Sequence, residues 1–158
     1  MGRGTTFKIY LPASVKKVVK IAEEAAEPVK KGKETVLLVD DEESMLEVGG
    51  ALLKTMGYRV YTARDGIEAL EIYGRSGGEI DIVLLDMIMP NMGGGEAFDH
   101  MKKINPAVKV LLLSGYSIDG EAAKILDRGC SGFIQKPFNM EELSRSIEAI
   151  LGEKVAAH

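Results

Sequence analysis

The sequence has little that would place the protein in an oxidising compartment or in a membrane. Cys130 is its single cysteine, so no disulfide can form within the chain, which fits a reducing compartment. We expect Cys130 to be a small buried apolar residue rather than a reactive thiol. No apolar run is long enough to span a bilayer, and no signal-peptide pattern begins the chain. We therefore expect a cytoplasmic chain without membrane contact, although a longer parent protein could be anchored in a membrane.

Strong positive charge is also missing. The formal net charge is -4, so the chain as a whole is not a polyanion binder and we expect no nucleic-acid partner. The charge is uneven along the chain, because residues 1–34 hold eight Lys and Arg against four Glu, whereas residues 35–158 hold twelve against twenty Asp and Glu. The two parts are therefore built differently, and the change predicts a boundary near Lys33.

The segment 14–34 combines two patterns. Apolar residues at helical spacing from Val15 to Ala26 are followed by Pro28 and a basic run from Lys30 to Lys33. We expect residues 14–34 to be a partly helical linker and residues 153–158 to be a short tail. The residues between them, 35–152, are numerous enough to form one domain with a real core.

Residues 35–152 alternate two kinds of segment. Nearly continuous apolar runs, typical of strands buried on both faces of a parallel sheet, lie at Val36–Val39, Tyr58–Thr62, Ile80–Leu85, Val108–Leu113 and Gly132–Ile134. After each run, residues at helical spacing mark one face of a helix: Leu46, Gly50, Leu53 and Met56; Ile67, Leu70 and Tyr73; Ala97, Met101 and Ile104; Ala122, Ile125 and Leu126; Leu143, Ile147, Ile150 and Leu151. Five strand–helix repeats with right-handed crossovers predict an α/β fold, a doubly wound five-stranded parallel sheet with helices on both faces.

Polar side chains follow four of the predicted strands. Asp40 and Asp41 follow the first strand, Asp86 the third, Ser114 the fourth and Lys136 the fifth. Because ligands of such folds bind at the carboxyl ends of the strands, we expect these residues to meet at one edge of the sheet. Three clustered carboxylates require a cation, and oxygen ligands suit Mg²⁺. With a lysine and a hydroxyl beside them, they predict phosphoryl-transfer chemistry.

Each of these residues also has a simpler structural role when it is taken alone. Aspartates after strands often cap the next helix, and a single lysine is usually a solvated charge. Asp86 could be a turn residue before Pro90, and Ser114 could be a helix cap or a turn donor. The combination of all of them in this order favours a functional site over these separate roles.

Four motifs resemble the receiver (CheY-like) domain of response regulators. They are VLLVDDE at Val36–Glu42, DIVLLDMIMPNMGG at Asp81–Gly94, VLLLSG at Val110–Gly115 and GFIQKPF at Gly132–Phe138. Their order and spacing match the family across residues 35–152. The resemblance implies the flavodoxin-like (βα)5 fold of that family and a phosphoaccepting domain of a two-component phosphorelay.

The resemblance also implies a role for each matching position. Asp86 would take the phosphoryl group, Lys136 would contact both Asp86 and that group, and Ser114 would hydrogen-bond a phosphoryl oxygen. Phe133 would be a switch aromatic whose ring moves when Ser114 moves. The ligands of Mg²⁺ would be Asp40, Asp41, Asp86 and the backbone carbonyl of Ile88. We further expect Ile88 and Tyr116 to flank the path of the water that removes the phosphate.

Such a domain would accept phosphate from a phosphohistidine on a histidine kinase or a histidine phosphotransfer domain. It would catalyse its own Mg²⁺-dependent phosphorylation and dephosphorylation. The two histidines of the chain, His100 and His158, lack the flanking pattern of a phosphohistidine donor, so the donor must lie elsewhere. We expect the chain to be a monomer or a weak dimer.

The first residues carry a second resemblance. Gly4–Pro12 is similar to the end of the ATP-binding domain of sensor histidine kinases, where a Gly-Thr-x-Phe turn leads into a last strand. This implies that residues 1–13 are a remnant of such a domain and that the parent is a hybrid histidine kinase with a C-terminal receiver. A fortuitous strand is the alternative. The chain lacks nearly all of an ATP site and is not a kinase by itself.

Other functions stay open at this point. One is a stand-alone single-domain response regulator that acts by protein contact, and another is a degenerate receiver, which the complete acidic and lysine set disfavours. A transcription factor is not expected, because no DNA-binding domain follows Gly152. A phosphatase-like hydrolase with an aspartyl nucleophile, similar to the haloacid dehalogenase family, would need a second aspartate at the position of Ile88.

Overall fold

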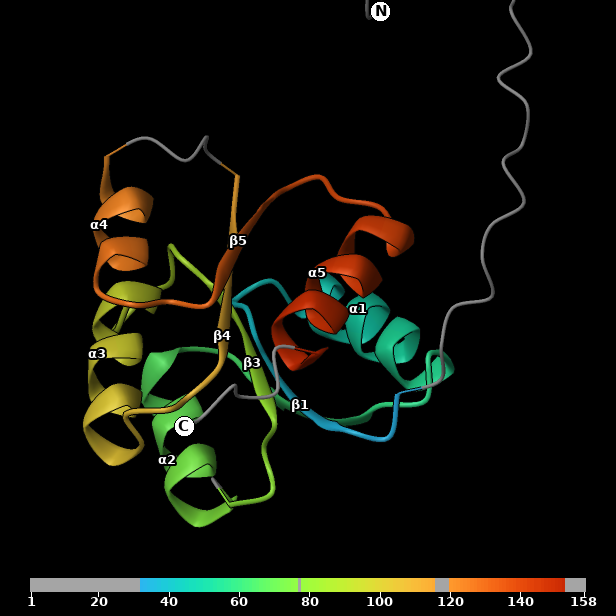
Figure 1. Ribbon diagram of the computed structural model, residues 1–158, viewed down its shortest axis with the longest axis horizontal. Coiled ribbons are helices and arrows are strands. Elements are labelled where there is room, and N and C mark those ends of the chain that lie inside the picture. The colour runs from blue at the N-terminus through green and yellow to red at the C-terminus, as the bar shows by residue number, and fades with distance from the viewer. Residues whose placement is uncertain (1–31, 77, 116–119, 153–158) are drawn as a thin grey trace, which may run out of the picture.

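The computed structural model describes residues 32–76, 78–115 and 120–152. The predicted kinase remnant at 1–13, nearly all of the predicted linker and the tail at 153–158 lie outside the described residues. Strands and helices alternate along the described part of the chain (Figure 1), and their bounds are β1 Thr35–Val39, α1 Glu43–Thr55, β2 Arg59–Ala63, α2 Gly66–Ser76, β3 Ile82–Asp86, α3 Gly94–Ile104, β4 Val110–Ser114, α4 Glu121–Asp127, β5 Gly132–Gln135 and α5 Met140–Gly152. Over these same residues, no helix has the length and apolar character needed to cross a membrane.

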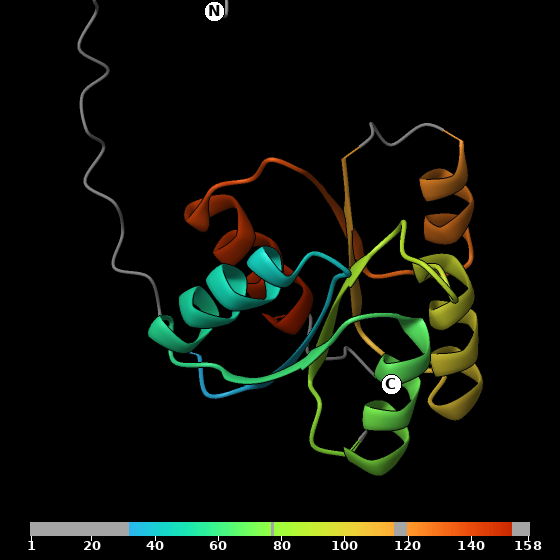
Figure 2. The same cartoon turned by 180° about the vertical axis from the view of Figure 1, so that it is seen from behind.

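All neighbouring strands of the sheet pair in parallel, in the order β2-β1-β3-β4-β5. Figures 1 and 2 show α1 and α5 on one face of the sheet and α2, α3 and α4 on the other. The predicted doubly wound fold is confirmed, although β3 and β4 begin two residues later than predicted. The chain reverses its direction of travel across the sheet between β1 and β3, and ligands of such folds bind beside that reversal.

Strands β1, β3 and β4 are buried along their whole length because helices cover both faces of the sheet. Their side chains alternate between two apolar cores. In β1, Leu37 and Val39 pack into the core that contains Phe98 of α3, whereas Val36 and Leu38 pack into the core beneath α1 and α5. Each fully buried aliphatic side chain stabilises the fold by about 2 kcal/mol. A strand that is covered on both faces is therefore apolar at nearly every position.

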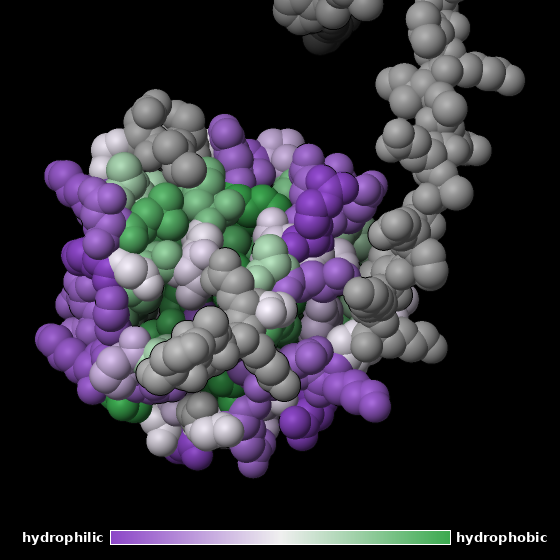
Figure 3. All heavy atoms as spheres, in the orientation of Figure 1, coloured by the Kyte–Doolittle hydropathy of each residue, from purple (hydrophilic) through white to green (hydrophobic). Residues whose placement is uncertain are grey.

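The outer sides of the helices carry the polar residues. In Figure 3, hydrophilic side chains cover the two flanks of the molecule, and apolar residues appear between them along the β5 edge of the sheet. His100 of α3 is among the exposed residues. This arrangement is what the predicted helical faces require, because one stripe of each helix is buried and the opposite side faces water.

The apolar faces predicted for α2 and α3 are shifted in the structure. Ile67 and Ile104 are 47% and 56% exposed, so their predicted place in the core is wrong. Ala69 and Phe98, which were not on the predicted faces, are buried, and Tyr73 is buried as predicted. Each isoleucine lies at an end of its helix, and burying the larger aromatic side chains removes more apolar area from water. The other residues of the predicted faces are buried or half-buried.

Cys130 is half-buried and packs against the core on the α3 side of the sheet. Its Sγ atom lies 3.1 Å from the carbonyl oxygen of Val110, within hydrogen-bond distance. Burial raises the pKa of the thiol, so the reactive thiolate is disfavoured. These observations support the interpretation of Cys130 as a structural residue.

Gly94 begins α3 directly against the backbone of Asp86. A Cβ atom at Gly94 would collide with the carbonyl oxygen of Asp86 and lie 3.1 Å from its carbonyl carbon. We therefore predict that Gly94→Ala lowers the free energy of unfolding by about 1–3 kcal/mol, because backbone must shift to admit the methyl group. The matched control is Gly74→Ala in α2, where a Cβ meets nothing within 4 Å and helix propensity improves. Urea denaturation measures both variants, and equal stability of the two would contradict the prediction.

Candidate functional site

The carboxyl ends of four strands bring the predicted polar residues to one edge of the sheet. Asp40 follows β1, Asp86 ends β3, Ser114 ends β4 and Lys136 follows β5. Because β1, β3, β4 and β5 are neighbours in a parallel sheet, these residues lie along the same edge. The backbone N–H of Lys136 donates a hydrogen bond to the carbonyl oxygen of Ser114 at 2.7 Å, which fixes where the lysine leaves the sheet.

The ammonium group of Lys136 lies between two carboxylates. Its Nζ atom donates to Oδ2 of Asp40 at 2.6 Å and to Oδ1 of Asp86 at 2.6 Å. The side chain of Asp40 is fully buried, that of Asp86 is 9% exposed and that of Lys136 is 21% exposed. Charge-assisted hydrogen bonds of this length in a buried setting are strong, so the three side chains form one unit.

The charges within this unit do not balance. Burial raises the pKa of Asp86, and the hydrogen bond from Lys136 only partly opposes that effect. Burial lowers the pKa of Lys136, but the hydrogen bonds to Asp40 and Asp86 outweigh it, so the net shift is upward. One ammonium group faces two buried carboxylates, so with both ionised the unit carries a negative charge that another cation would neutralise.

The remaining carboxylate oxygens of the unit accept backbone hydrogen bonds. Oδ1 of Asp40 accepts from the N–H of Glu42 at 3.0 Å, and Oδ2 of Asp86 accepts from the N–H of Ile88 at 3.0 Å. Both donors belong to the loops that follow the strands. Each aspartate is thus oriented by one backbone amide and by Lys136, which holds its oxygen atoms in a defined direction.

Whether the residues fit Mg²⁺ can be judged from the donor atoms. In the described ranges, no three Asp, Glu, His or Cys side chains are grouped as in a preformed metal site. The expected cluster of three carboxylates is not seen there, because Asp41 is exposed while Lys136 lies between Asp40 and Asp86. The donor set still consists only of oxygen atoms with excess negative charge, as Mg²⁺ prefers. The assignment of Asp41 and of the Ile88 carbonyl as ligands stays a prediction.

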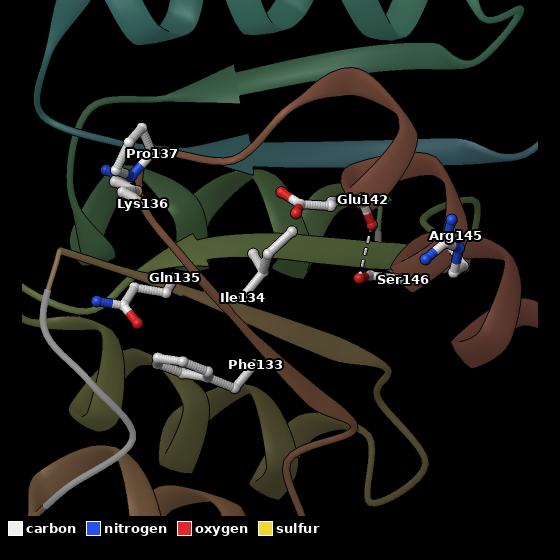
Figure 4. A pocket seen from close by; sticks show the side chains of 8 residues that line it. All are labelled: Phe133, Ile134, Gln135, Lys136, Pro137, Glu142, Arg145 and Ser146. Carbon is white, nitrogen blue, oxygen red and sulfur yellow. Dashed lines mark hydrogen bonds between the residues drawn. The ribbon is translucent and has the colours of Figure 1, made fainter. Parts of the chain in front are cut away.

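The two predicted switch residues lie on adjacent strands. Ser114 is buried at the end of β4, and Phe133 is half-buried in β5. Figure 4 shows Phe133 and Ile134 pointing to opposite sides of β5, with Lys136 at the end of that strand. Phe133 and Lys136 also line a shallow surface hollow that extends to α5. Tyr116 lies outside the described residues.

Sequence reasoning missed one contact beside the site. Asn91, in the loop after β3, donates a side-chain hydrogen bond to Asp65, which precedes α2. The local signals were an Asp-Gly pair before a predicted helix and an asparagine after a proline, which indicate a helix cap and a turn separately. Neither signal alone says that the two segments touch.

Comparison with known proteins identifies the chain's relatives. A family model described as the response regulator receiver domain matches residues 36–148. The sensor kinase CckA of Brucella abortus is 37% identical over 161 aligned positions, which cover 96% of this chain and 17% of that protein. The transcriptional regulatory protein GlrR of Escherichia coli is 30% identical, over 77% of this chain and 27% of that protein. The chain thus spans only a small part of these curated relatives.

Solved structures show the same fold. A response regulator receiver domain protein from Clostridium thermocellum has a TM-score of 0.73 at 30% identity, covering 77% of this chain and 96% of that chain. CheY in the CheX–CheY–BeF3–Mg complex from Borrelia burgdorferi has a TM-score of 0.71 at 26% identity, covering 74% and 88%. TrrA from Thermotoga maritima, in complex with Mg–BeF, has a TM-score of 0.67 at 30% identity, covering 75% and 99%.

Removing the ammonium group should leave two buried carboxylates uncompensated. We predict that Lys136→Met lowers the free energy of unfolding at pH 7 by about 3 kcal/mol. Without Lys136 the pKa of Asp86, already raised, should rise further. A carboxyl whose folded-state pKa is raised contributes stability below its unfolded pKa and loses it as the pH rises through the folded pKa. The deficit should therefore shrink as the pH falls towards about 4, and urea denaturation at several pH values measures it.

The matched control is Lys54→Met, which removes an exposed lysine from α1 and should change stability by less than about 0.5 kcal/mol. Combining Lys136→Met with Asp86→Asn should recover part of the loss, because one of the two facing charges is gone. A loss for Lys136→Met that does not depend on pH would show that packing, rather than charge, stabilises the unit.

Proposed function

The chain belongs to the response regulator receiver domain family, and we propose that Asp86 is the residue that takes the phosphoryl group. Receiver domains of two-component systems act in general with histidine kinases or histidine phosphotransfer proteins, and we infer that a phosphohistidine on such a partner is the donor. The observation that carries this proposal is the ion pair of Lys136 with Asp86 and Asp40 at the carboxyl edge of the sheet.

The transfer itself needs few chemical groups from the protein. A carboxylate oxygen of Asp86 attacks the phosphorus atom and forms the O–P bond of an acyl phosphate. The P–N bond to the donor imidazole breaks, and the imidazole nitrogen keeps the electron pair and takes a proton. Lys136, 2.6 Å from Asp86, stands where it would contact the arriving phosphoryl oxygens. Ser114, at the adjacent strand end, would donate a hydrogen bond to another of them.

Mg²⁺ fits the excess negative charge and the oxygen donors of this site. When bound, it would neutralise charge on the phosphoryl oxygens. The proposed ligands are the carboxylates of Asp40, Asp41 and Asp86 and the backbone carbonyl of Ile88. Support comes from the similar CheY and TrrA structures, which are complexes with Mg²⁺ and a beryllium fluoride.

Phosphorylation would change the charge of the site and so act as a switch. The acyl phosphate adds negative charge and acceptor oxygens next to Lys136 and Ser114. We infer that Ser114 moves toward the phosphoryl group and that Phe133 follows, which alters the surface formed by α4, β5 and α5. Water attack on the acyl phosphate would reset the switch, so the domain would catalyse both its own phosphorylation and its own dephosphorylation.

We infer that the parent protein is a hybrid sensor histidine kinase. The family model covers residues 36–148, whereas the similarity to the sensor kinase CckA covers 96% of the chain and so includes most residues before Thr35. Similarity to the transcriptional regulators GlrR and ZraR covers only 77% and 73%. This difference supports a kinase remnant at residues 1–13. The complete reading frame tests the inference, and a frame without an upstream ATP-binding domain would favour the stand-alone regulator instead.

Incubation with Mg²⁺ and a small acyl phosphate should add one phosphoryl group to the chain. We expect intact-mass spectrometry to show the addition and fragmentation to place it on Asp86, because Lys136 holds both Asp40 and Asp86, but the side chain of Asp40 is fully buried whereas that of Asp86 is 9% exposed. A phosphorylated histidine kinase should serve as donor as well. Omission of Mg²⁺ should slow the reaction strongly.

Asp86→Asn is the control for the assignment, since it keeps the shape of the side chain and removes the nucleophile. Asp99→Asn, an exposed carboxylate of α3 paired with Arg128, is the matched variant that should be labelled like the wild type. Equal labelling of Asp86→Asn, or no labelling of the wild type, would refute the proposed function.

A further inference from the structure

The loop that follows Asp86 is tied to the start of α2. Nδ2 of Asn91 donates a hydrogen bond to Oδ2 of Asp65 at 2.9 Å, and the backbone N–H of Gly66 donates to the carbonyl oxygen of Met92 at 3.2 Å. Asp65 and Asn91 are 26 positions apart in the chain, and neither lies at the strand ends that form the site. The contact between Asp65 and Asn91 therefore joins a segment outside the site to the loop that leaves it.

Asp65 is itself fixed by the cap of α2. Its Oδ1 accepts from the backbone N–H of Glu68 at 2.9 Å, and Oε2 of Glu68 accepts from the backbone N–H of Arg64 at 2.8 Å. This reciprocal pattern resembles a capping box and leaves little freedom to the Asp65 side chain. The hydrogen bonds from Glu68 and then from Asn91 lower the pKa of Asp65, so the group is ionised near neutral pH.

Asn91 adopts a backbone conformation that few residues tolerate. Its φ is 63°, in the left-handed region, where asparagine is one of the favoured non-glycine residues. The loop also packs closely against the start of α2. A Cβ at Gly66 would lie 2.7 Å from Cγ of Met92 and 2.8 Å from its carbonyl oxygen. A loop keeps a left-handed residue in place when its surroundings fix the backbone. For Asn91, the hydrogen bond to the charged carboxylate of Asp65 is such a contact.

The loop contacts the carboxylate of Asp86 three residues before it reaches Asn91. The backbone N–H of Ile88 donates to Oδ2 of Asp86 at 3.0 Å, while Lys136 holds Oδ1 at 2.6 Å. Each oxygen of the Asp86 carboxylate thus accepts one of these two hydrogen bonds. The direction of the Ile88 amide depends on the course of the loop, and three residues later the loop reaches Asn91 and its bond to Asp65.

We propose that Asp65 is a positioning residue for the phosphoacceptor, because through Asn91 it holds the loop that directs the Ile88 amide at Asp86. The inference rests on the proposed function of Asp86 and gives Asp65 no contact with the phosphoryl group. Loss of the Asp65–Asn91 bond lets the loop and the amide reorient. Phosphorylation of Asp86 then slows, since small displacements of a reacting group are costly, while the domain stays folded.

Exchange of the two side chains tests this proposal. In Asn91→Asp, two carboxylates face each other and the hydrogen bond is lost. In the double variant Asp65→Asn/Asn91→Asp, donor and acceptor trade places and the bond can form again. Asparagine is as good a helix cap as aspartate, so the cap of α2 is kept. The matched control Glu71→Gln removes an exposed ion pair with Arg75 on the same helix.

Two quantities are measured on the full chain. The first is the amide resonance of Ile88 without phosphodonor, and the second is the initial rate of phosphorylation with Mg²⁺ and a small acyl phosphate. We expect Asn91→Asp to shift the resonance and to slow the reaction about tenfold, the effect of one charged hydrogen bond. The double variant should restore both, and Glu71→Gln should change neither. Wild-type behaviour of Asn91→Asp, or a double variant that stays slow, overturns the proposal.

A second variant covers the case in which Asn91→Asp does not fold. Asn91→Gly removes the same donor at a φ that glycine adopts readily. A shifted resonance and a slower rate in this variant support the proposal, and wild-type values overturn it. If the wild type takes no phosphate at Asp86, the proposed function fails instead. The Ile88 resonance of the same variants then still decides whether Asp65 positions the loop.

Discussion

The Nζ atom of Lys136 lies 2.6 Å from an oxygen of Asp40 and 2.6 Å from an oxygen of Asp86, and both carboxylates are buried. Two negative charges taken out of water share one positive charge, so the lysine attracts both carboxylates, the carboxylates repel each other, and the three groups together are not neutral. Burial raises the pKa of Asp86 in spite of the lysine, so the ionised carboxylate is costly without a further cation. A site of this kind favours an added cation. It also keeps a single carboxylate close to the surface, where a phosphoryl group can reach it.

This contact joins parts of the chain that are far apart in the sequence. Asp40 and Lys136 are 96 positions apart, and Asp86 and Lys136 are 50 apart. The parallel sheet brings them together by placing β1, β3, β4 and β5 side by side. Backbone details then orient the groups: Gly94 lets α3 begin against Asp86, and the Ile88 amide directs one oxygen of that residue. The same loop is hydrogen-bonded to Asp65, just before α2, so the surroundings of Asp86 extend beyond the strand ends.

Much of this was predictable from the sequence, and the exceptions have physical causes. Alternation of apolar runs with helical spacing identified the sheet, because strands covered on both faces must be apolar throughout. The rule that ligands bind at strand ends located Asp40, Asp86 and Lys136. The contact of Lys136 with Asp86 was expected from the resemblance, but its second hydrogen bond, to Asp40, was not, because a pattern of residue types does not say which oxygen meets which nitrogen. Tyr73 of α2 is buried as predicted, but Ile67 is exposed because it lies in the first turn of the helix, and Ala69 is buried in its place.

The chain belongs to the receiver domain family, and we propose that the uncompensated negative charge around Asp86 prepares this residue to bind a cation and accept a phosphoryl group. The most direct test of that claim is a titration of the chain with Mg²⁺ and no phosphodonor, followed through the carboxyl carbon resonance of Asp86. We predict a saturable change in the wild type and binding weaker by about tenfold in Asp40→Asn, which removes one of the two facing negative charges. A wild-type resonance that does not respond to Mg²⁺, or a variant that binds as tightly as the wild type, would contradict it.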